Sequence, residues 1–198
     1  MVAYGDGRND VLIFTDGWVP DPRPWAKKET CPKGYVGRIG AVMFHKTLPE
    51  LLCLHLLIPE AWAWAWRERG TQIVLVELLA PLIALYTWQL FVCGRTIVLF
   101  NDSTTAESML VKGYSNVAVD CNSVIAEFWN LCCLSQVCAY IDRVPTDGNP
   151  SDGCARGTAF EDSLLYGWEL CRVLLSETWM EIWHGSAFRE MGNTEVVI

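Results

Sequence analysis

Short apolar runs alternate along the chain with longer apolar stripes of helical spacing. Runs rich in β-branched and aromatic residues are typical of buried strands when turn residues bound them. Such runs predict strands at residues 11–16, 36–45, 51–58, 96–100 and 138–144. Stripes with three-to-four-residue spacing predict helices at about residues 71–92, 104–113, 122–136 and 158–181.

The order of these segments indicates the fold class. Three consecutive strands predict an antiparallel meander, and the alternation of strands and helices after it predicts parallel pairing. We therefore expect an α/β fold with a mixed five-stranded sheet flanked by helices. With 198 residues, the chain is long enough to bury a large core.

Two carboxylates stand at the ends of predicted strands. Asp16 closes the run Val11-Leu12-Ile13-Phe14-Thr15, and Asp102 follows Thr96-Ile97-Val98-Leu99-Phe100-Asn101. A charge at the rim of a sheet needs a partner or a metal, because burying it alone is costly. If the two strands are neighbours, the two carboxylates share one site.

Two further acids fall near the same place in the expected topology. Glu77 lies among apolar neighbours in a predicted helix, and Asp152 precedes the last one. Each acid alone has an ordinary explanation as a cap, a turn residue or an exposed helix residue. Together they would converge at the strand ends, where open α/β sheets bind ligands. Such a cluster repels itself without cations, and its oxygen ligands favour Mg²⁺ or Mn²⁺.

Composition limits the alternatives. The net charge of −8 argues against broad electrostatic adhesion to nucleic acid, although it permits a local basic groove or a cation site. No uninterrupted apolar run reaches the roughly 18 residues of a membrane span, and the first residues do not resemble a signal peptide. Nine scattered cysteines indicate thiols in a reducing compartment, cytoplasmic or nuclear.

Several blocks of sequence carry a resemblance to a known family. They are Phe14-Thr15-Asp16, Val76-Glu77-Leu78-Leu79, Phe100-Asn101-Asp102-Ser103 and Arg143-Val144-Pro145 ahead of Asn149-Pro150-Ser151-Asp152. In these blocks the chain resembles the ribonuclease H family, most nearly the ribonuclease H domains of retroelement (DIRS-like) reverse transcriptases. The resemblance implies a catalytic domain over residues 1–160, with residues 161–198 as its C-terminal helical extension.

The resemblance also implies an activity. It predicts hydrolysis of the RNA strand of RNA/DNA hybrids by a two-metal mechanism, with two Mg²⁺ ions, for which Mn²⁺ may substitute. The implied metal ligands and catalytic residues are Asp16, Glu77, Asp102 and Asp152. Asn101, Ser103 and Asn149 are candidates for contacts to the 2′-hydroxyl groups of the RNA, or they only satisfy loop backbone. A reverse transcriptase domain or another protein is a second expected partner.

The chain departs from the family pattern in two places. Many family members carry a histidine in the loop ahead of the last acid, and residues 145–151 contain none. A proline-rich insertion also follows Asp16.

Two other functions fit the same pattern. Integrases and transposases use this arrangement on DNA, but their last acid is usually a glutamate on a helix, whereas Asp152 follows Asn149-Pro150. A catalytically weak or inactive module for protein or nucleic-acid assembly is the other alternative. Trp62, Trp64 and Trp66, which alternate with alanine, would suit base stacking or a helix packed on the core.

Overall fold

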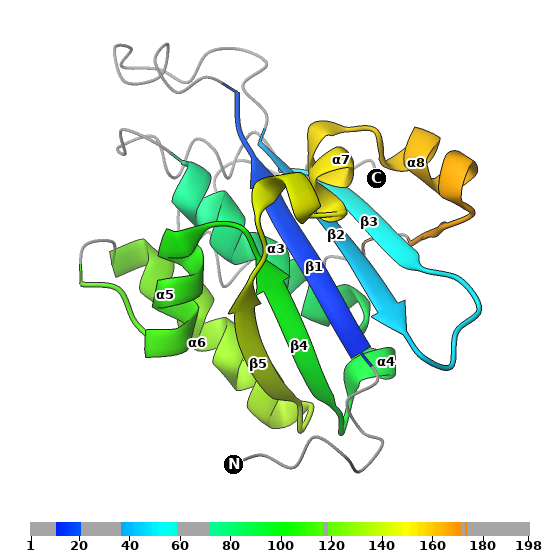
Figure 1. Ribbon diagram of the computed structural model, residues 1–198. Helices are drawn as coiled ribbons and strands as arrows, with labels where there is room; N and C mark the ends of the chain where they lie inside the picture. Colours follow the sequence, from blue (N-terminus) through cyan, green and yellow to red (C-terminus); the bar gives the residue numbers. More distant parts are fainter. Residues whose placement is uncertain (1–10, 21–36, 59–71, 117–118, 172, 174–198) are drawn as a thin grey trace, which may run out of the picture.

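The computed structural model describes residues 11–20, 37–58, 72–116, 119–171 and 173 (Figure 1). Three sequence-based expectations lie outside these residues. They are the proline-rich insertion after Asp16, the alternating tryptophans of residues 62–66, and the chain beyond residue 173.

Six strands form one sheet in the spatial order β5-β4-β1-β2-β3-β6. They are β1 (Val11–Trp18), β2 (Arg38–His45), β3 (Leu52–Leu57), β4 (Thr96–Asn101), β5 (Cys138–Arg143) and β6 (Glu169–Leu170). β1, β2 and β3 pair antiparallel, whereas β1, β4 and β5 pair parallel. The mixed sheet flanked by helices is the predicted fold class.

The sequence predicted five strands, and the sixth is a correction. A single helix over residues 158–181 was expected, but α8 (Ala159–Tyr166) ends at Gly167, whose φ is +69°. This left-handed conformation costs glycine little and stops helices. Glu169 and Leu170 then pair parallel with β3.

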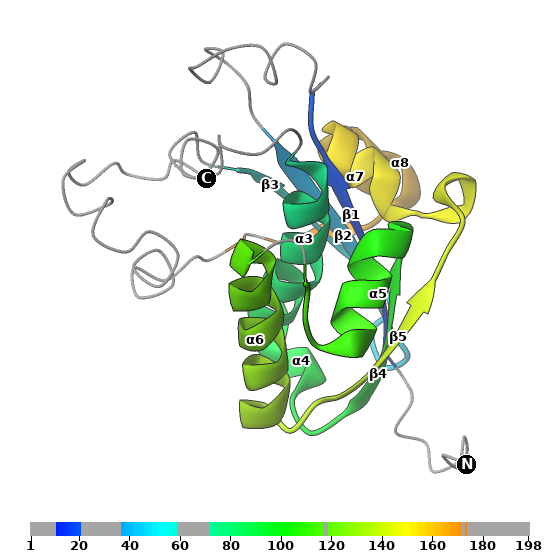
Figure 2. The ribbon, with the colours of Figure 1, turned by 90° about the vertical axis from the view of Figure 1, so that its left-hand side faces the viewer.

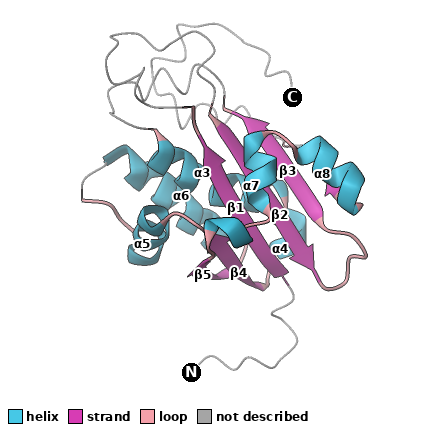
Figure 3. Ribbon diagram, turned by 45° about the horizontal axis from the view of Figure 1, so that its top comes forward, coloured by secondary structure: helices cyan, strands magenta, loops and turns pink. Residues whose placement is uncertain are grey.

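Six further helical segments connect the strands. They are α3 (Ile73–Thr87), α4 (Gln89–Val92), α5 (Thr104–Lys112), α6 (Val119–Leu134), the 3₁₀ turn η1 (Thr146–Gly148) and α7 (Ser151–Arg156). In Figure 2, α3, α5 and α6 lie on one side of the sheet, and α7 and α8 lie on the other. Figure 3 shows α7 across β1 and β2. The sheet is therefore the middle of three layers.

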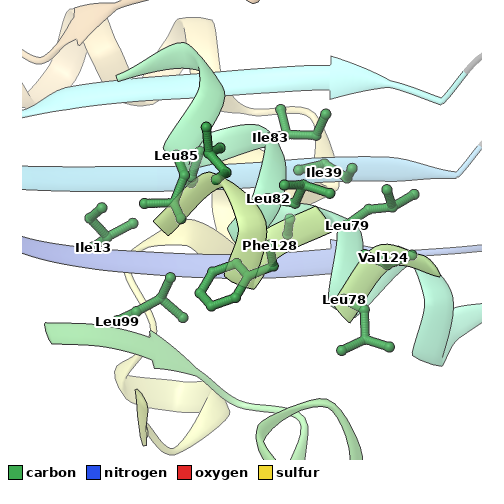
Figure 4. Packing of buried hydrophobic residues seen from close by; sticks show 14 of the residues in the cluster. Ile13, Ile39, Leu78, Leu79, Leu82, Ile83, Leu85, Leu99, Val124 and Phe128 are labelled. Atoms are coloured by element: carbon green, nitrogen blue, oxygen red, sulfur yellow. The ribbon is translucent and has the colours of Figure 1, made fainter. Parts of the chain in front are cut away.

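The core lies between the sheet and α3. Every residue from Leu75 to Leu85 is buried, and the predicted apolar stripe of this helix belongs to that run. Ile13 of β1, Leu99 of β4 and Phe128 of α6 complete the packing shown in Figure 4. A helix that is buried all round is held rigidly, which matters for the one carboxylate it carries.

Two further observations concern the cysteines and the helices. The eight cysteines in the described part of the chain are all free thiols. Among the described residues, no helix has the length and hydropathy that crossing a membrane requires.

Candidate metal centre

Parallel pairing of β1 with β4 brings two of the predicted acids together. Thr15 of β1 lies opposite Asn101 of β4 in the register. The residues that follow them, Asp16 and Asp102, are therefore neighbours. β1 runs on to Trp18, two residues past its predicted end. Asp16 therefore sits within a hydrogen-bonded strand rather than on a loop.

The third acid arrives from α3 because a glycine lets the helix touch the sheet. A Cβ atom on Gly17 would lie 2.7 Å from the backbone nitrogen of Glu77 and 2.9 Å from the carbonyl carbon of Val76. Only a residue without a side chain allows that approach. As a result, one carboxylate oxygen from each of Asp16, Glu77 and Asp102 lies within 4.8 Å of the other two.

The electrostatics of this cluster call for a cation. Asp16 is 5% exposed and Glu77 is 7% exposed. Burial, reinforced by the charges of Asp102 and Asp152, raises the pKa of Asp16 to about 7. Burial, reinforced by Asp16 and Asp102, raises the pKa of Glu77 to about 9. Near neutral pH, Glu77 would thus hold a proton, and Asp16 would be protonated in about half of the molecules, unless a cation replaced those protons.

Two oxygens of the cluster have no partner in the described part of the chain. Oε2 of Glu77 and Oδ1 of Asp102 are buried and accept no hydrogen bond there. Buried polar atoms are normally satisfied, so orphaned ones at one point need an explanation. Three carboxylates, two of them with an orphaned oxygen, fit a hard divalent cation such as Mg²⁺.

Asp152 does not join the three-acid cluster, but it faces the same space. A pocket of about 330 Å³ is lined by all four acids and by Gly17, Trp18, Val19, Ile73, Thr146 and Arg156. Both carboxylate oxygens of Asp152 accept hydrogen bonds from Nε of Arg156, at 2.8 and 2.7 Å. The alternative role of Asp152 as a helix cap finds no support, because Asp152 lies within α7 and Pro150 occupies its N-cap position.

Asn101 and Ser103 form hydrogen bonds within the protein. Asn101 is fully buried, and its Nδ2 donates to the carbonyl of Glu77 and to Oγ1 of Thr15, both at 3.3 Å. Its Oδ1 accepts the backbone N–H of Ser103 at 2.8 Å. Ser103 in turn caps α5 by accepting the N–H of Ala106. These bonds fix the backbone around Glu77 and Asp102, and direct contact with a substrate stays a prediction.

Asn149 plays a similar part on the other side of the pocket. Its Nδ2 donates to the carbonyl of Thr15 at 3.2 Å, and its Oδ1 accepts the Oγ hydroxyl and the N–H of Ser151. The buried amide thereby ties the start of α7 to β1. Its contact with a substrate also stays a prediction.

Three residues of the site were missed by reasoning from the sequence. Trp18 lines the pocket. The guanidinium of Arg38 lies over its ring, with Cζ 4.9 Å from the ring centroid. Nη1 of Arg38 donates to the carbonyl of Arg156, which pairs with Asp152. The four-residue spacing from Asp152 to Arg156 was the available signal, but it indicates a pair only within a helix. The predicted helix began after both residues.

No protein-family model matches the chain, and no curated protein matches its sequence. Solved structures do match it. LC11-RNase H1, isolated from compost by a metagenomic approach, is 15% identical with a TM-score of 0.55, over 79% of this chain and 99% of that one. LC11-RNase H1 in complex with an RNA/DNA hybrid is 14% identical with a TM-score of 0.52, over 78% and 99%. These two structures show that the chain has the ribonuclease H fold.

Proposed function

We propose that this chain is a metal-dependent endoribonuclease that hydrolyses the RNA strand of RNA/DNA hybrids. The observation that carries the proposal is the cluster of Asp16, Glu77 and Asp102, whose oxygens lie within 4.8 Å of one another at the strand ends. Fold alone does not give function, so the argument rests on these side chains. That LC11-RNase H1 has been solved with an RNA/DNA hybrid supports the choice of substrate.

The carboxylates are suited to hold Mg²⁺, and Mn²⁺ is expected to substitute, since both ions take oxygen ligands. Asp16, Glu77 and Asp102 would hold one ion, and Asp16 with Asp152 a second. When bound, the cations would make a nucleophile from water at neutral pH and stabilise the leaving 3′ oxygen.

The protein itself supplies rigidity. Glu77 is fixed by the buried helix α3, and Asp16 by the pairing of β1 on both sides. Asn101 ties the carbonyl of Glu77 to the end of β4. Because these groups are already in place before the reaction, little reorganisation is needed when charge develops on the phosphate.

Selectivity for RNA requires recognition of the 2′-hydroxyl. Asn101, Ser103 and Asn149 are the residues we propose for it, and all three lie on or beside the loops that border the pocket. Their amides and hydroxyl already bond to the backbone, so any contact with the RNA would use the second lone pairs or the loop N–H groups they orient.

The biological setting is also a proposal. The sequence resemblance supports a retroelement reverse-transcription system, with a reverse transcriptase domain or another protein as partner. The scattered cysteines support a cytoplasmic or nuclear compartment. One structural observation suits a protein partner and also favours the alternative of an assembly module. α8 exposes four large apolar side chains by 61–72%, namely Phe160, Leu164, Leu165 and Tyr166.

A gel assay tests the proposed activity. End-labelled RNA/DNA hybrid, duplex RNA and duplex DNA are incubated with the protein in Mg²⁺, beside the Asp102→Asn variant. We expect cleavage of the RNA strand of the hybrid alone, and none with the variant. Cleavage of duplex DNA would favour the integrase-like alternative, and no cleavage of any substrate would favour the assembly module.

A further inference from the structure

The pocket contains a positive charge that the proposed reaction leaves without a role. Among the described residues that line it, Arg156 is the only cation, facing Asp16, Glu77, Asp102 and Asp152. Its side chain is 56% exposed, so it stands at the mouth of the pocket rather than inside it. A nucleic-acid backbone entering this pocket would meet Arg156 beside the carboxylates.

The guanidinium is held by one edge only. In the described part of the chain, its hydrogen bonds all come from Nε, which donates to both oxygens of Asp152. The two terminal amino groups, which carry four of the five N–H donors of arginine, donate no hydrogen bond to a described residue. A guanidinium with a free edge is suited to bind a phosphate through two parallel hydrogen bonds.

The backbone of Arg156 is fixed as well. Nη1 of Arg38 donates to its carbonyl, and the same guanidinium lies over the ring of Trp18. The chain turns immediately afterwards at Gly157, whose φ is +100°. With the main chain and Nε both anchored, the direction of the free edge is set before any ligand arrives, which lowers the entropic cost of binding.

From this arrangement we propose that Arg156 is a substrate-binding residue that contacts a backbone phosphate next to the scissile one. The inference rests on the proposed function. Cations on the carboxylates would neutralise the centre of the pocket, but the flanking phosphates of a hybrid still need a counter-charge. The net charge of −8 makes such a local cation more important than in a basic protein.

A purely structural role for Arg156 makes different predictions. An exposed ion pair four residues apart contributes little to stability, and a cation near a helix C-terminus adds a similarly small amount. Loss of Arg156 would then change stability slightly and leave hybrid binding unchanged. Binding, rather than stability, therefore separates the two roles.

The test measures binding without relying on cleavage. Fluorescence anisotropy of a labelled RNA/DNA hybrid is recorded in Ca²⁺, which accepts the same oxygen ligands in a looser geometry than Mg²⁺. The variants are Arg156→Ala, Arg156→Lys and, as the matched control, Lys46→Ala. Lys46 is exposed just after β2, at the opposite end of that strand from Arg38. Replacing it by alanine removes one positive charge, as Arg156→Ala does, but at a distance from the pocket.

We expect Arg156→Ala to weaken binding by about tenfold or more, because a hydrogen bond to a charged group is lost. The slope of log Kd against log salt concentration should fall by about 1. Arg156→Lys should recover part of the affinity, since it keeps the charge without the fork. If Arg156→Ala and Lys46→Ala bind the hybrid with the same Kd and the same dependence of Kd on salt concentration, the inference is overturned.

A second comparison excludes action through Asp152. In an Asp152→Asn background, adding Arg156→Ala should still weaken binding, since the guanidinium keeps its charge and its terminal N–H donors when the ion pair that orients it is lost. Equal binding by the single and double variants would overturn the inference in favour of a positioning role. If the wild-type protein binds and cleaves the hybrid, and Arg156→Ala binds it equally well, the inference fails while the proposed function stands. Wild-type protein that does neither would refute that function and this inference with it.

Discussion

Gly40 of β2 lies directly beneath the backbone of Ala155 in α7. A Cβ atom placed on Gly40 would be 2.2 Å from the backbone nitrogen of Ala155 and 2.6 Å from the carbonyl oxygen of Ser151. Gly40 is also the register partner of Asp16. This close approach of α7 to the sheet is therefore made beside the central carboxylate, and it helps to set how far Asp152 stands from that carboxylate.

Gly40→Ala is expected to force α7 away from the sheet. Overpacking of a tight contact costs about 1–3 kcal/mol, and here the contacted atoms are backbone and cannot turn aside. We expect a lower free energy of unfolding in urea and a reduced kcat on RNA/DNA hybrid, because Asp152 moves with the helix. Gly148→Ala is the control, since its added methyl would have only Val144 nearby, at 3.7 Å. Equal unfolding curves for the two variants would contradict this packing.

Glu77→Gln and Asp102→Asn should each abolish most of the cleavage while the fold persists. Each amide keeps the shape of the side chain but removes a charged ligand from the three-acid cluster. We expect the rate on the hybrid to fall by orders of magnitude, with an unchanged circular dichroism spectrum. Glu50→Gln, in the exposed turn between β2 and β3, is the control and should cleave normally. Wild-type rates in either cluster variant would refute the metal-site assignment.

Without metal, stability should depend on pH in the direction that the raised pKa values set. In the folded state the pKa of Asp16 is about 7 and that of Glu77 about 9, well above the values of unfolded chains. Below a pH of about 4, both carboxyl groups are protonated in the folded and in the unfolded chain, and the raised pKa values do not affect stability. As the pH rises toward 9, the unfolded chain loses these protons more readily than the folded chain, so the free energy of unfolding falls. Thermal melts in EDTA from pH 5 to 9 check this. Glu77→Gln should flatten the alkaline part of the curve, and a Tm that rises with pH would contradict the prediction.

Removal of metal should stop catalysis without unfolding the protein. The core between α3 and the sheet is held by apolar packing rather than by a cation, so EDTA should abolish cleavage and leave the circular dichroism spectrum intact. Mg²⁺ or Mn²⁺ should restore activity, and Mg²⁺ should raise the Tm by mass action. Stoichiometric zinc held by cysteines in the purified protein would contradict a hard-cation site.

Asp152→Asn tests whether Asp152 is a metal ligand or only the partner of Arg156 in a surface ion pair. The pair with Arg156 is partly exposed and worth little, so the Tm should barely change. If Asp152 holds the second cation, cleavage should fall strongly. Activity within a few-fold of wild type would show that only three carboxylates form the site, and would favour the alternative of an assembly module.

The strands and three of the acids could be predicted because their signals are local. Apolar runs ended by Asp16 and Asp102 need only the parallel pairing of two strands to become neighbours, and Glu77 lies on a helix whose apolar pattern is unmistakable. The predicted strand bounds differ from the observed ones by at most two residues among the described positions.

The rest depends on contacts that a local pattern does not encode. α7 is only six residues long and has no apolar period, so neither it nor the pair of Asp152 with Arg156 was predicted. β6 exists because Gly167 ends α8 beside an open edge of the sheet. The bonds of Asn149 to β1 likewise join segments whose proximity only the tertiary fold creates.

Asn149 and Thr15 are 134 residues apart, yet a hydrogen bond between them joins the two sides of the pocket. Contacts of such long sequence separation are slow to form, because the chain must first lose the entropy of closing the loop. The meander and the β1–β4 pair can assemble while α7 is still undocked, but the pocket cannot. During synthesis on the ribosome, the chain could therefore bring Asp16, Glu77 and Asp102 together first, and would add Asp152 only after α7 has emerged and docked.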